Sequence, residues 1–318
     1  MTEWFEVVKL TGGLVYLLVG GDLLVRGAIG FSARTRIPEA VVGLTIVALG
    51  TSAPELFVSI YAALSGHAEI AIGNVVGSNI ANVLLVLGVP ALIHAIPTGK
   101  EAGLRRDASF MLAVTVLFIG LCFVPPFGTV TGIVLLVALA VGLWLMYDTY
   151  AQGSDLGEDG EESEEELGTP DRSWVIVLFL GLGIVMLPLG ADLTVESASM
   201  IATRIGVSEA VIAASLIALG TSLPELSTTV IAALRGRSDI ALGNVIGSNV
   251  LNIALIMGVA ALLADIAIPA SFLEQDLWVM LAATLALWGI VLRRITIGRT
   301  AGFALLGGYL SYMALLYR

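Results

Sequence analysis

The chain has 318 residues, of which 58% are hydrophobic and 13% are charged, and its mean hydropathy is +0.98. Soluble domains average roughly 45–50% apolar and about 25% charged residues, so this composition excludes an ordinary soluble globular protein. The single cysteine, Cys122, lies in an apolar run and excludes both an intramolecular disulfide and a multi-cysteine metal site. The composition predicts an integral membrane protein, and we expect no enzymatic activity, no cofactor and no nucleic-acid partner.

Apolar runs separated by glycine, proline or charged residues divide the chain into ten segments, most of them near the roughly 20 residues that cross a bilayer. The first segment lacks the short apolar core and small-residue cleavage site of a signal peptide, so we interpret it as a permanent helix. We expect an all-α integral membrane protein with ten transmembrane helices at residues 8–32, 38–64, 70–96, 107–124, 128–149, 173–203, 208–234, 240–264, 275–292 and 299–317.

The second and seventh segments carry the same motif. Residues 43–56 read GLTIVALGTSAPEL and residues 213–226 read AASLIALGTSLPEL, 170 positions later and without a gap. The chain is therefore a duplicated unit. Five crossings in each copy place the second copy upside down relative to the first, as in transporters with inverted repeats. We expect two inverted-topology five-helix repeats, at residues 1–150 with the motif at 43–90, and at residues 173–318 with the motif at 213–260.

The loops after the first, third, fifth, seventh and ninth helices hold eleven of the fifteen basic residues. The positive-inside rule places these loops in the cytoplasm and both termini outside it, and the short loops are typical of a bacterial inner-membrane protein. Residues 151–172 join the two repeats on the cytoplasmic side and hold nine of the 26 acidic residues. We expect this linker to be solvated and disordered, because like charges repel and cannot form a packed core. A weak calcium-sensing role is the alternative.

Each copy of the motif predicts a break in a membrane-spanning helix. Gly50 and Pro54 interrupt regular backbone bonding in the first copy, as Gly220 and Pro224 do in the second. Proline removes an amide donor and clashes with the carbonyl one turn earlier. Carbonyls freed at membrane depth are tolerated where they line a cavity or meet a ligand. The break therefore predicts exposed oxygen ligands near the middle of the membrane.

Thr51, Ser52 and Glu55 add hydroxyl and carboxylate oxygens within one turn of the first break. Thr221, Ser222 and Glu225 are their counterparts in the second copy. An unpaired carboxylate in a membrane segment is costly and marks a functional site by default. Hard cations such as Ca²⁺ prefer six to eight oxygen ligands, which the two copies can supply together.

A second repeated element, IGNVVGSNIAN at residues 72–82 and LGNVIGSNVLN at residues 242–252, adds hydroxyl and carboxamide groups. Ser78 and Asn82 are four residues apart and share a helix face, as do Ser248 and Asn252. These faces can point toward the glutamates, with Asn74 and Asn244 one turn earlier. The alternative is that these small polar residues only pack the helices and form hydrogen bonds between them.

The charge of the two glutamates limits which cations the site can hold. Two ionised glutamates are neutralised by one Ca²⁺ or by two Na⁺, so the same site cannot hold both loads together. Mutual exclusion at one site, combined with alternating exposure of an inverted-repeat scaffold, is sufficient for antiport. A passive cation channel is the alternative within transport, and the ions and the lipid bilayer are the only partners that the sequence indicates.

The paired GTSAPEL and GTSLPEL motifs, each followed by GNVxGSN, resemble the two alpha-repeats of the cation/calcium exchanger superfamily, in particular its bacterial sodium/calcium exchanger-like branch. The resemblance covers nearly the whole chain and implies a Ca²⁺/Na⁺ antiporter. It implies that Glu55 and Glu225 are the principal Ca²⁺ ligands, assisted by the main-chain carbonyls of Thr51 and Thr221. It further implies that Na⁺ uses the two glutamates together with Ala48, Ser52, Ser78, Ala218, Thr221, Ser222 and Ser248.

One position departs from the family pattern. Many members carry aspartate where this chain has Asn252, and both motifs end here in asparagine, at Asn82 and Asn252. A carboxamide does not ionise, so the stoichiometry, the electrogenicity and any potassium requirement stay open. Proton/calcium exchangers usually replace the Thr-Ser pair of the motif, so the retained pairs favour sodium over the alternative, an antiporter that exchanges protons for Ca²⁺ or another divalent cation.

Asp22 and Asp192 also match across the repeats, and Arg26 lies one turn after Asp22, where an ion pair can form. We expect both aspartates to be structural or interfacial, since neither lies in a broken-helix motif, and a role in ion entry is the alternative. The two histidines, His67 and His94, fall near helix ends and are expected at the membrane interface.

Overall fold

The computed structural model describes residues 3–98, 102–152, 168–206 and 218–316. Within them the chain is helical, with two isolated β-bridges. The helices of the first half are α1 (Glu3–Thr35), α2 (Glu39–Val42), η1 (Gly43–Val47), α3 (Ala48–Thr51), α4 (Ala53–Leu64), α5 (Ala68–Ala81), η2 (Asn82–Val86), α6 (Gly88–Ile93), α7 (Ala102–Cys122) and α8 (Thr129–Gln152). Those of the second half are α9 (Ser173–Arg204), α11 (Ala218–Gly220), α12 (Leu223–Leu234), α13 (Ser238–Leu251), η4 (Asn252–Met257), α14 (Gly258–Leu263), η5 (Phe272–Asp276), α15 (Leu277–Leu292) and α16 (Arg299–Leu316).

The helices coincide with the ten predicted segments. Six of them are long and apolar enough to cross a membrane, and the bent pair Glu39–Thr51 and Ala53–Leu64 makes a seventh span. The remaining three segments are α7, α12 and α16. The first part of the predicted segment 208–234 and most of the acidic linker, at residues 207–217 and 153–167, lie outside the described residues. The chain is a multi-pass membrane protein with the predicted all-α fold.

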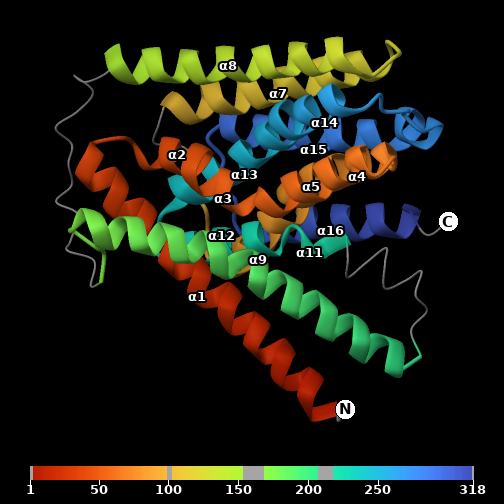
Figure 1. Ribbon diagram of the computed structural model, residues 1–318. Helices are drawn as coiled ribbons and strands as arrows, with labels where there is room; N and C mark the ends of the chain where they lie inside the picture. Colours follow the sequence, from red (N-terminus) through yellow and green to blue (C-terminus); the bar gives the residue numbers. More distant parts are fainter. Residues whose placement is uncertain (1–2, 99–101, 153–167, 207–217, 317–318) are drawn as a thin grey trace.

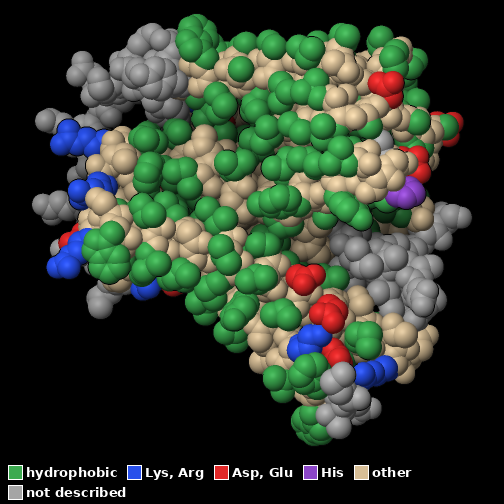
Figure 2. All heavy atoms as spheres, in the orientation of Figure 1, with side chains coloured by type: hydrophobic (Ala, Val, Ile, Leu, Met, Phe, Trp, Pro, Cys, Tyr) green, Lys and Arg blue, Asp and Glu red, His purple; other side chains and the backbone are tan. Residues whose placement is uncertain are grey.

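Two long helices, α1 and α9, lie side by side and cross the other helices obliquely, whereas the others run roughly along one direction (Figure 1). The end of α1, which carries Arg34, and the short helix α2 lie at one end of this bundle (Figure 1), and Arg235 and Arg237 bind Asp22 of α1 and Glu39 of α2. Lys and Arg side chains gather at this end, the left edge of Figure 2, which we call the arginine-rich end. The start of α1 and the end of α16 lie toward the other end, which we call the terminal end (Figure 1). Hydrophobic side chains cover most of the face between the two ends (Figure 2), as a lipid-facing surface requires.

The two halves are related by an approximate two-fold arrangement. Ile96 forms a β-bridge with Ile297, and Phe127 forms one with Ile266. Because residues 170 positions apart are equivalent, the second bridge repeats the first with the two copies exchanged. The turns after α4 and α12 repeat in the same way, with glycine in the left-handed region at Gly66 (φ 80°) and Gly236 (φ 69°). The predicted inverted repeat is therefore a feature of the fold.

The repeat changes register by one residue between α7 and α15. Asp107, Met111 and Thr115 are buried on α7, and Asp276, Met280 and Thr284 are buried 169 positions later on α15. The Thr115 hydroxyl donates to the Met111 carbonyl over 2.8 Å, and the Thr284 hydroxyl donates to the Met280 carbonyl over 2.8 Å. The strict 170-residue spacing pairs Asp107 with Leu277 and conceals this relation.

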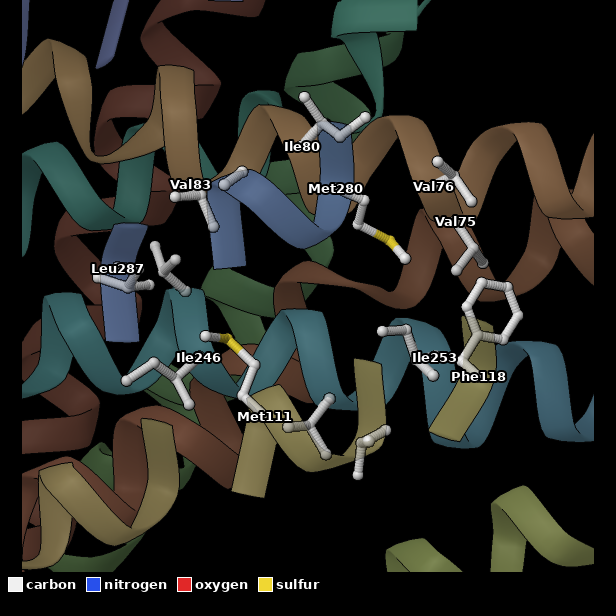
Figure 3. Packing of buried hydrophobic residues seen from close by; sticks show 14 of the residues in the cluster. Val75, Val76, Ile80, Val83, Met111, Phe118, Ile246, Ile253, Met280 and Leu287 are labelled. Carbon is white, nitrogen blue, oxygen red and sulfur yellow. The ribbon is translucent and has the colours of Figure 1, made fainter. Parts of the chain in front are cut away.

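The centre of the bundle is formed by α5 and α13. In the most apolar 18-residue stretch of the spans Ser238–Leu263 and Glu69–Ile93, 83% and 72% is buried within the protein, against 28% for Thr129–Met146. Their apolar side chains pack against α7 and α15, with Met111 near Ile246 and Met280 near Ile80 (Figure 3). The second repeated element, at residues 72–82 and 242–252, thus lies on the two spans that are most removed from lipid, where polar groups can meet other polar groups.

Salt bridges join helices at the arginine-rich end. The predicted pair is present, with Arg26 Nε 3.6 Å from a carboxylate oxygen of Asp22. Arg235, at the end of α12, also binds this carboxylate through Nε at 3.0 Å, and Arg237 binds Glu39 at 3.2 Å. Asp22 therefore connects α1 to the second repeat, which supports the structural role expected for it.

Candidate ion-binding site

Both predicted helix breaks are present. The backbone leaves helical geometry at Ser52 (φ −82°, ψ 7°) and at Ser222 (φ −86°, ψ 1°). The first break bends the span by 48°. Pro54 and Pro224 lie in the first turn of the helices that follow, where a missing amide hydrogen costs nothing. Each proline instead leaves the carbonyl four residues earlier, at Gly50 or Gly220, without its helical donor.

Glu55 and Glu225 occupy the first turns of α4 and α12, and each has 0% of its surface exposed. The N-terminal end of a helix carries a partial positive charge, which favours a carboxylate there. The Ser52 hydroxyl donates to Glu225 Oε1 over 3.0 Å. The other Glu225 oxygen and both Glu55 oxygens accept no hydrogen bond from the described residues. Three carboxylate oxygens are therefore buried and available to a ligand.

The described residues place no basic side chain in a salt bridge with either glutamate. They also contain no group of three or more His, Cys, Asp and Glu side chains suited to a metal ion. The charged groups of the site are thus two carboxylates, and its other polar groups are neutral hydroxyls, carboxamides and carbonyls. Such a set of oxygens suits hard cations rather than transition metals, which prefer imidazole or thiolate ligands.

Two asparagines hold the backbone of the motif in equivalent ways. Asn74 Nδ2 donates to the Glu55 carbonyl over 3.2 Å and to the Ser59 hydroxyl over 3.0 Å. Asn244 Nδ2 donates to the Glu225 carbonyl over 3.5 Å and to the Thr229 hydroxyl over 3.1 Å. The two asparagines thus fix α4 against α5 and α12 against α13. Their placement beside the glutamates agrees with the sequence, whereas the two hydroxyl partners were not predicted.

Further side-chain hydrogen bonds at the site cross between the repeats. The Ser52 bond to Glu225 is the first, and the Thr51 hydroxyl donates to Asn244 Oδ1 over 3.1 Å. Asn82 Nδ2 donates to Asn249 Oδ1 over 3.1 Å. Asn249 was not predicted, although its equivalence to Asn79 in the repeated motif is a signal that could have identified it.

The counterparts of these bonds are missing among the described residues. Ser222 Oγ, both Glu55 oxygens, and the side-chain amide atoms of Asn79 and Asn252 have no hydrogen-bond partner there. These residues are the equivalents of Ser52, Glu225, Asn249 and Asn82, which are bonded. Residues that match in sequence therefore have unequal surroundings, and the two repeats differ in conformation at the site.

The other predicted residues lie in the same region. Thr51, Ser52, Ser78, Asn82, Ser222, Ser248 and Asn252 are all buried. The Ala48 carbonyl accepts from the Ser52 amide over 2.9 Å and from the Thr51 hydroxyl over 3.3 Å. Ala218 is the first residue of α11, and Thr221 lies in the turn between α11 and α12. Asn82 and Asn252 begin the π-helices η2 and η4, a local widening that often occurs at functional sites.

Comparison with known proteins assigns this arrangement to one family. The family model described as sodium/calcium exchanger protein matches residues 5–147 and 175–318. These two ranges contain both halves of the fold and every residue of the site.

Relatives and solved structures agree with this match. The chain is 37% identical to the putative antiporter CaxA of Alkalimonas amylolytica, over 96% of each chain. It is 34% identical to the sodium/calcium exchanger MaX1 of Methanosarcina acetivorans, again over 96% of each. It is also similar to a structure of the sodium-calcium exchanger NCX_Mj soaked with 10 mM Na⁺ and zero Ca²⁺, with a TM-score of 0.82 and 30% identity over 98% of this chain and 99% of that one.

Proposed function

The chain belongs to the sodium/calcium exchanger family, and from this premise we propose that it is a secondary antiporter that exchanges Ca²⁺ for Na⁺ across a membrane by alternating access. The relatives whose names state an activity are antiporters or exchangers, so transport rather than enzymatic catalysis is the activity to test. The ions are substrates, and the chain's own oxygens are sufficient to bind them without a cofactor.

The observation that carries the proposal is the pair of fully buried glutamates, one from each repeat, with three carboxylate oxygens that accept no hydrogen bond from the described residues. Unpaired carboxylates at this depth are strongly unfavourable unless they bind a cation. One Ca²⁺ or two Na⁺ would neutralise them. Competition of the two loads for the same carboxylates then links the two fluxes.

The ligands that we propose come from matched positions of the two repeats. Glu55 and Glu225 hold Ca²⁺ together with the carbonyls of Thr51 and Thr221. The neutral oxygens around them hold Na⁺ as the load changes. The full set is Ala48, Thr51, Ser52, Glu55, Ser78 and Asn82 with Ala218, Thr221, Ser222, Glu225, Ser248 and Asn252.

The unequal hydrogen bonding of the two repeats supports alternating access. Ser52 is bonded to Glu225, whereas Ser222 has no partner among the described residues. Exchanging the conformations of the two repeats would form a bond from Ser222 to Glu55 and break the bond from Ser52. Such an exchange of conformations would close the site to one end of the bundle and open it to the other.

We further propose that the repeats extend over residues 1–150 and 173–318, with the linker 151–172 on the cytoplasmic side. The arginine-rich end then faces the cytoplasm, and both termini lie outside it, as the positive-inside rule requires. A relative that is 34% identical over 96% of the chain is named inner membrane protein YrbG of Escherichia coli, which supports residence in the inner membrane.

Uptake of radiolabelled Ca²⁺ into proteoliposomes tests the function. Vesicles are loaded with Na⁺, with K⁺ or with an acidic buffer, and the wild type is compared with Glu55→Gln and Glu225→Gln. Uptake that requires internal Na⁺ and is lost in both variants is the expected result. Uptake driven by protons alone would identify a proton/Ca²⁺ antiporter, and uptake without any counter-ion would identify a channel.

A further inference from the structure

A polar cavity lies outside the glutamate site. It has a volume of about 760 Å³ and lies between α5, η5 and α16, toward the terminal end, where Leu315 and Leu316 line it. We call it the η5–α16 cavity. Its polar lining comes from Ser271, Glu274, Gln275, Asp276, Tyr309 and Tyr312.

Asp276 is the buried charge of this cavity, since only 5% of its surface is exposed. The Tyr312 hydroxyl donates to Asp276 Oδ1 over 3.1 Å, and Tyr312 is itself 7% exposed. Glu274 adds a second, exposed carboxylate two residues earlier. The described lining contains no lysine, arginine or histidine. The described lining therefore carries two acidic groups and no basic one, although a buried carboxylate is costly without a positive partner.

One wall of the cavity is formed by α5, the helix that also carries Asn74 and Ser78 of the glutamate site. Gly73 and Gly77 of α5 line the cavity. Each immediately precedes a polar residue of the site, because Asn74 binds the Glu55 carbonyl and Ser78 is a proposed ligand. A side chain at Gly73 would meet only Phe272, 3.7 Å away, so this wall is open. The cavity thus reaches α5 beside the site.

The equivalent space at the other end of the bundle has a different chemistry. It has a volume of about 210 Å³, and Leu139, Leu143 and Gly247 line it at the positions equivalent to Tyr309, Met313 and Gly77. The aspartate there, Asp107, is bound by its neighbour Arg106 through Nε at 2.9 Å and Nη2 at 2.8 Å. The same scaffold is therefore small, apolar and charge-compensated at the arginine-rich end. At the terminal end the described lining is polar and contains no basic side chain to pair with Asp276.

We propose that the η5–α16 cavity binds a hard cation that keeps part of its water shell. Asp276 supplies the main charge, Glu274 supplies the second, and the phenol and carboxamide oxygens complete the polar lining. The volume exceeds what a single dehydrated ion needs, which suits a hydrated one. The bound cation is positioned to pass along α5 to the glutamates from the terminal end. The binding itself is independent of the proposed exchange, whereas this second step depends on it.

Cation binding is tested first in a protein that lacks the glutamate site. In the purified Glu55→Gln/Glu225→Gln variant, equilibrium binding of radiolabelled Ca²⁺ should retain a weak component that Na⁺ displaces. Adding Asp276→Asn should weaken this component by about fivefold or more, because one of two charges is lost. Glu274→Gln, at an exposed position, should weaken it less. Asp107→Asn is the matched control on the other helix and should leave it unchanged.

Each outcome decides the proposal. The proposal is overturned if the Glu55→Gln/Glu225→Gln variant shows no weak Ca²⁺ binding. It is also overturned if neither Asp276→Asn nor Glu274→Gln changes that binding. Size-exclusion profiles and melting temperatures establish that the variants are folded, and Tyr312→Phe keeps the carboxylate in place if Asp276→Asn does not fold.

The access step is tested by transport with the glutamates intact. Asp276→Asn should raise the half-saturating Ca²⁺ concentration at the terminal end about fivefold and leave the maximal rate and the other side unchanged. An equal change on both sides would contradict the sidedness. If the wild type exchanges no ions, the proposed function fails, while the binding experiment still decides the cavity.

Discussion

The Ser52 hydroxyl, from the helix break of the first repeat, donates to the carboxylate of Glu225 in the second repeat over 3.0 Å. Its sequence equivalent, Ser222, is 1% exposed and has no hydrogen-bond partner among the described residues. Ser52 therefore stabilises the present conformation through this bond, whereas Ser222 makes no equivalent bond to a described residue in it. Because only one of the two serines is hydrogen-bonded, substituting each in turn should have different effects on stability.

We predict that Ser52→Ala destabilises the ion-free protein more than Ser222→Ala. The first substitution removes a hydrogen bond to a charged group, which contributes about 1.5–3 kcal/mol to stability, whereas the second removes no such bond. Thermal or chemical unfolding in detergent without Ca²⁺ and Na⁺ measures the difference, with each variant serving as the matched control of the other. Equal losses of stability would show that the two serines have the same surroundings.

We predict that Glu55→Gln and Glu225→Gln separate ion binding from stability. Each substitution removes a buried charge and should leave the ion-free protein at least as stable as the wild type. Saturating Ca²⁺ should stabilise the wild type by about 2.7 kcal/mol at 100 times Kd, because the ligand binds only the folded state. The variants should lose this stabilisation. Melting curves over a Ca²⁺ series, with Mg²⁺ as the parallel series, provide the measurement; Ca²⁺ stabilisation that persists in both variants would contradict the two-glutamate site.

Much of the fold could be predicted from the sequence because its signals are local or repeated. Apolar length predicts the helices, and the Gly-x₃-Pro pattern predicts the breaks at Ser52 and Ser222. The cost of an unpaired carboxylate in a membrane indicates the role of Glu55 and Glu225. Each of these features follows from a short stretch of chain and requires no knowledge of how distant helices meet.

The features that were missed depend on how distant helices meet. Arg235 binds Asp22 from the other repeat, and no sequence spacing indicates that contact. Asp107 and Asp276 are equivalent only after the one-residue change of register, so a comparison at a fixed spacing of 170 residues separates them. The unequal bonding of the two repeats is also absent from the sequence, because matched residues carry the same information in both copies.

We predict that Asn244→Ala costs more stability than Asn74→Ala. Both asparagines hold the motif backbone, but Asn244 also accepts from the Thr51 hydroxyl of the other repeat over 3.1 Å and is fully buried. Its loss removes one more hydrogen bond than the loss of Asn74, which contributes about 0.5–1.5 kcal/mol to stability, while the Thr51 hydroxyl keeps the Ala48 carbonyl as an acceptor over 3.3 Å. Chemical unfolding of the two variants measures the order. The opposite order would show that the contact between the repeats contributes little.

We predict that Gly243→Ala disturbs the protein while Gly73→Ala at the equivalent position is tolerated. A Cβ atom at Gly243 would lie 2.5 Å from the Ala40 carbonyl oxygen and 3.0 Å from the Leu44 amide, both backbone atoms that cannot rotate away. At Gly73 the nearest contact is Phe272 Cζ at 3.7 Å, an ordinary distance.

The clash at Gly243 should cost about 1–3 kcal/mol, as overpacking typically does, in the conformation where α13 lies against α2 and η1. If the contact opens when access changes ends, Gly243→Ala favours the opposite conformation and slows exchange, since both conformations must be visited in each cycle. Melting temperature and exchange rate are measured together for both variants. Normal exchange and stability in Gly243→Ala would mean that α13 does not pack this closely against α2 in the working protein, and an equal defect in Gly73→Ala would remove the asymmetry from which the prediction follows.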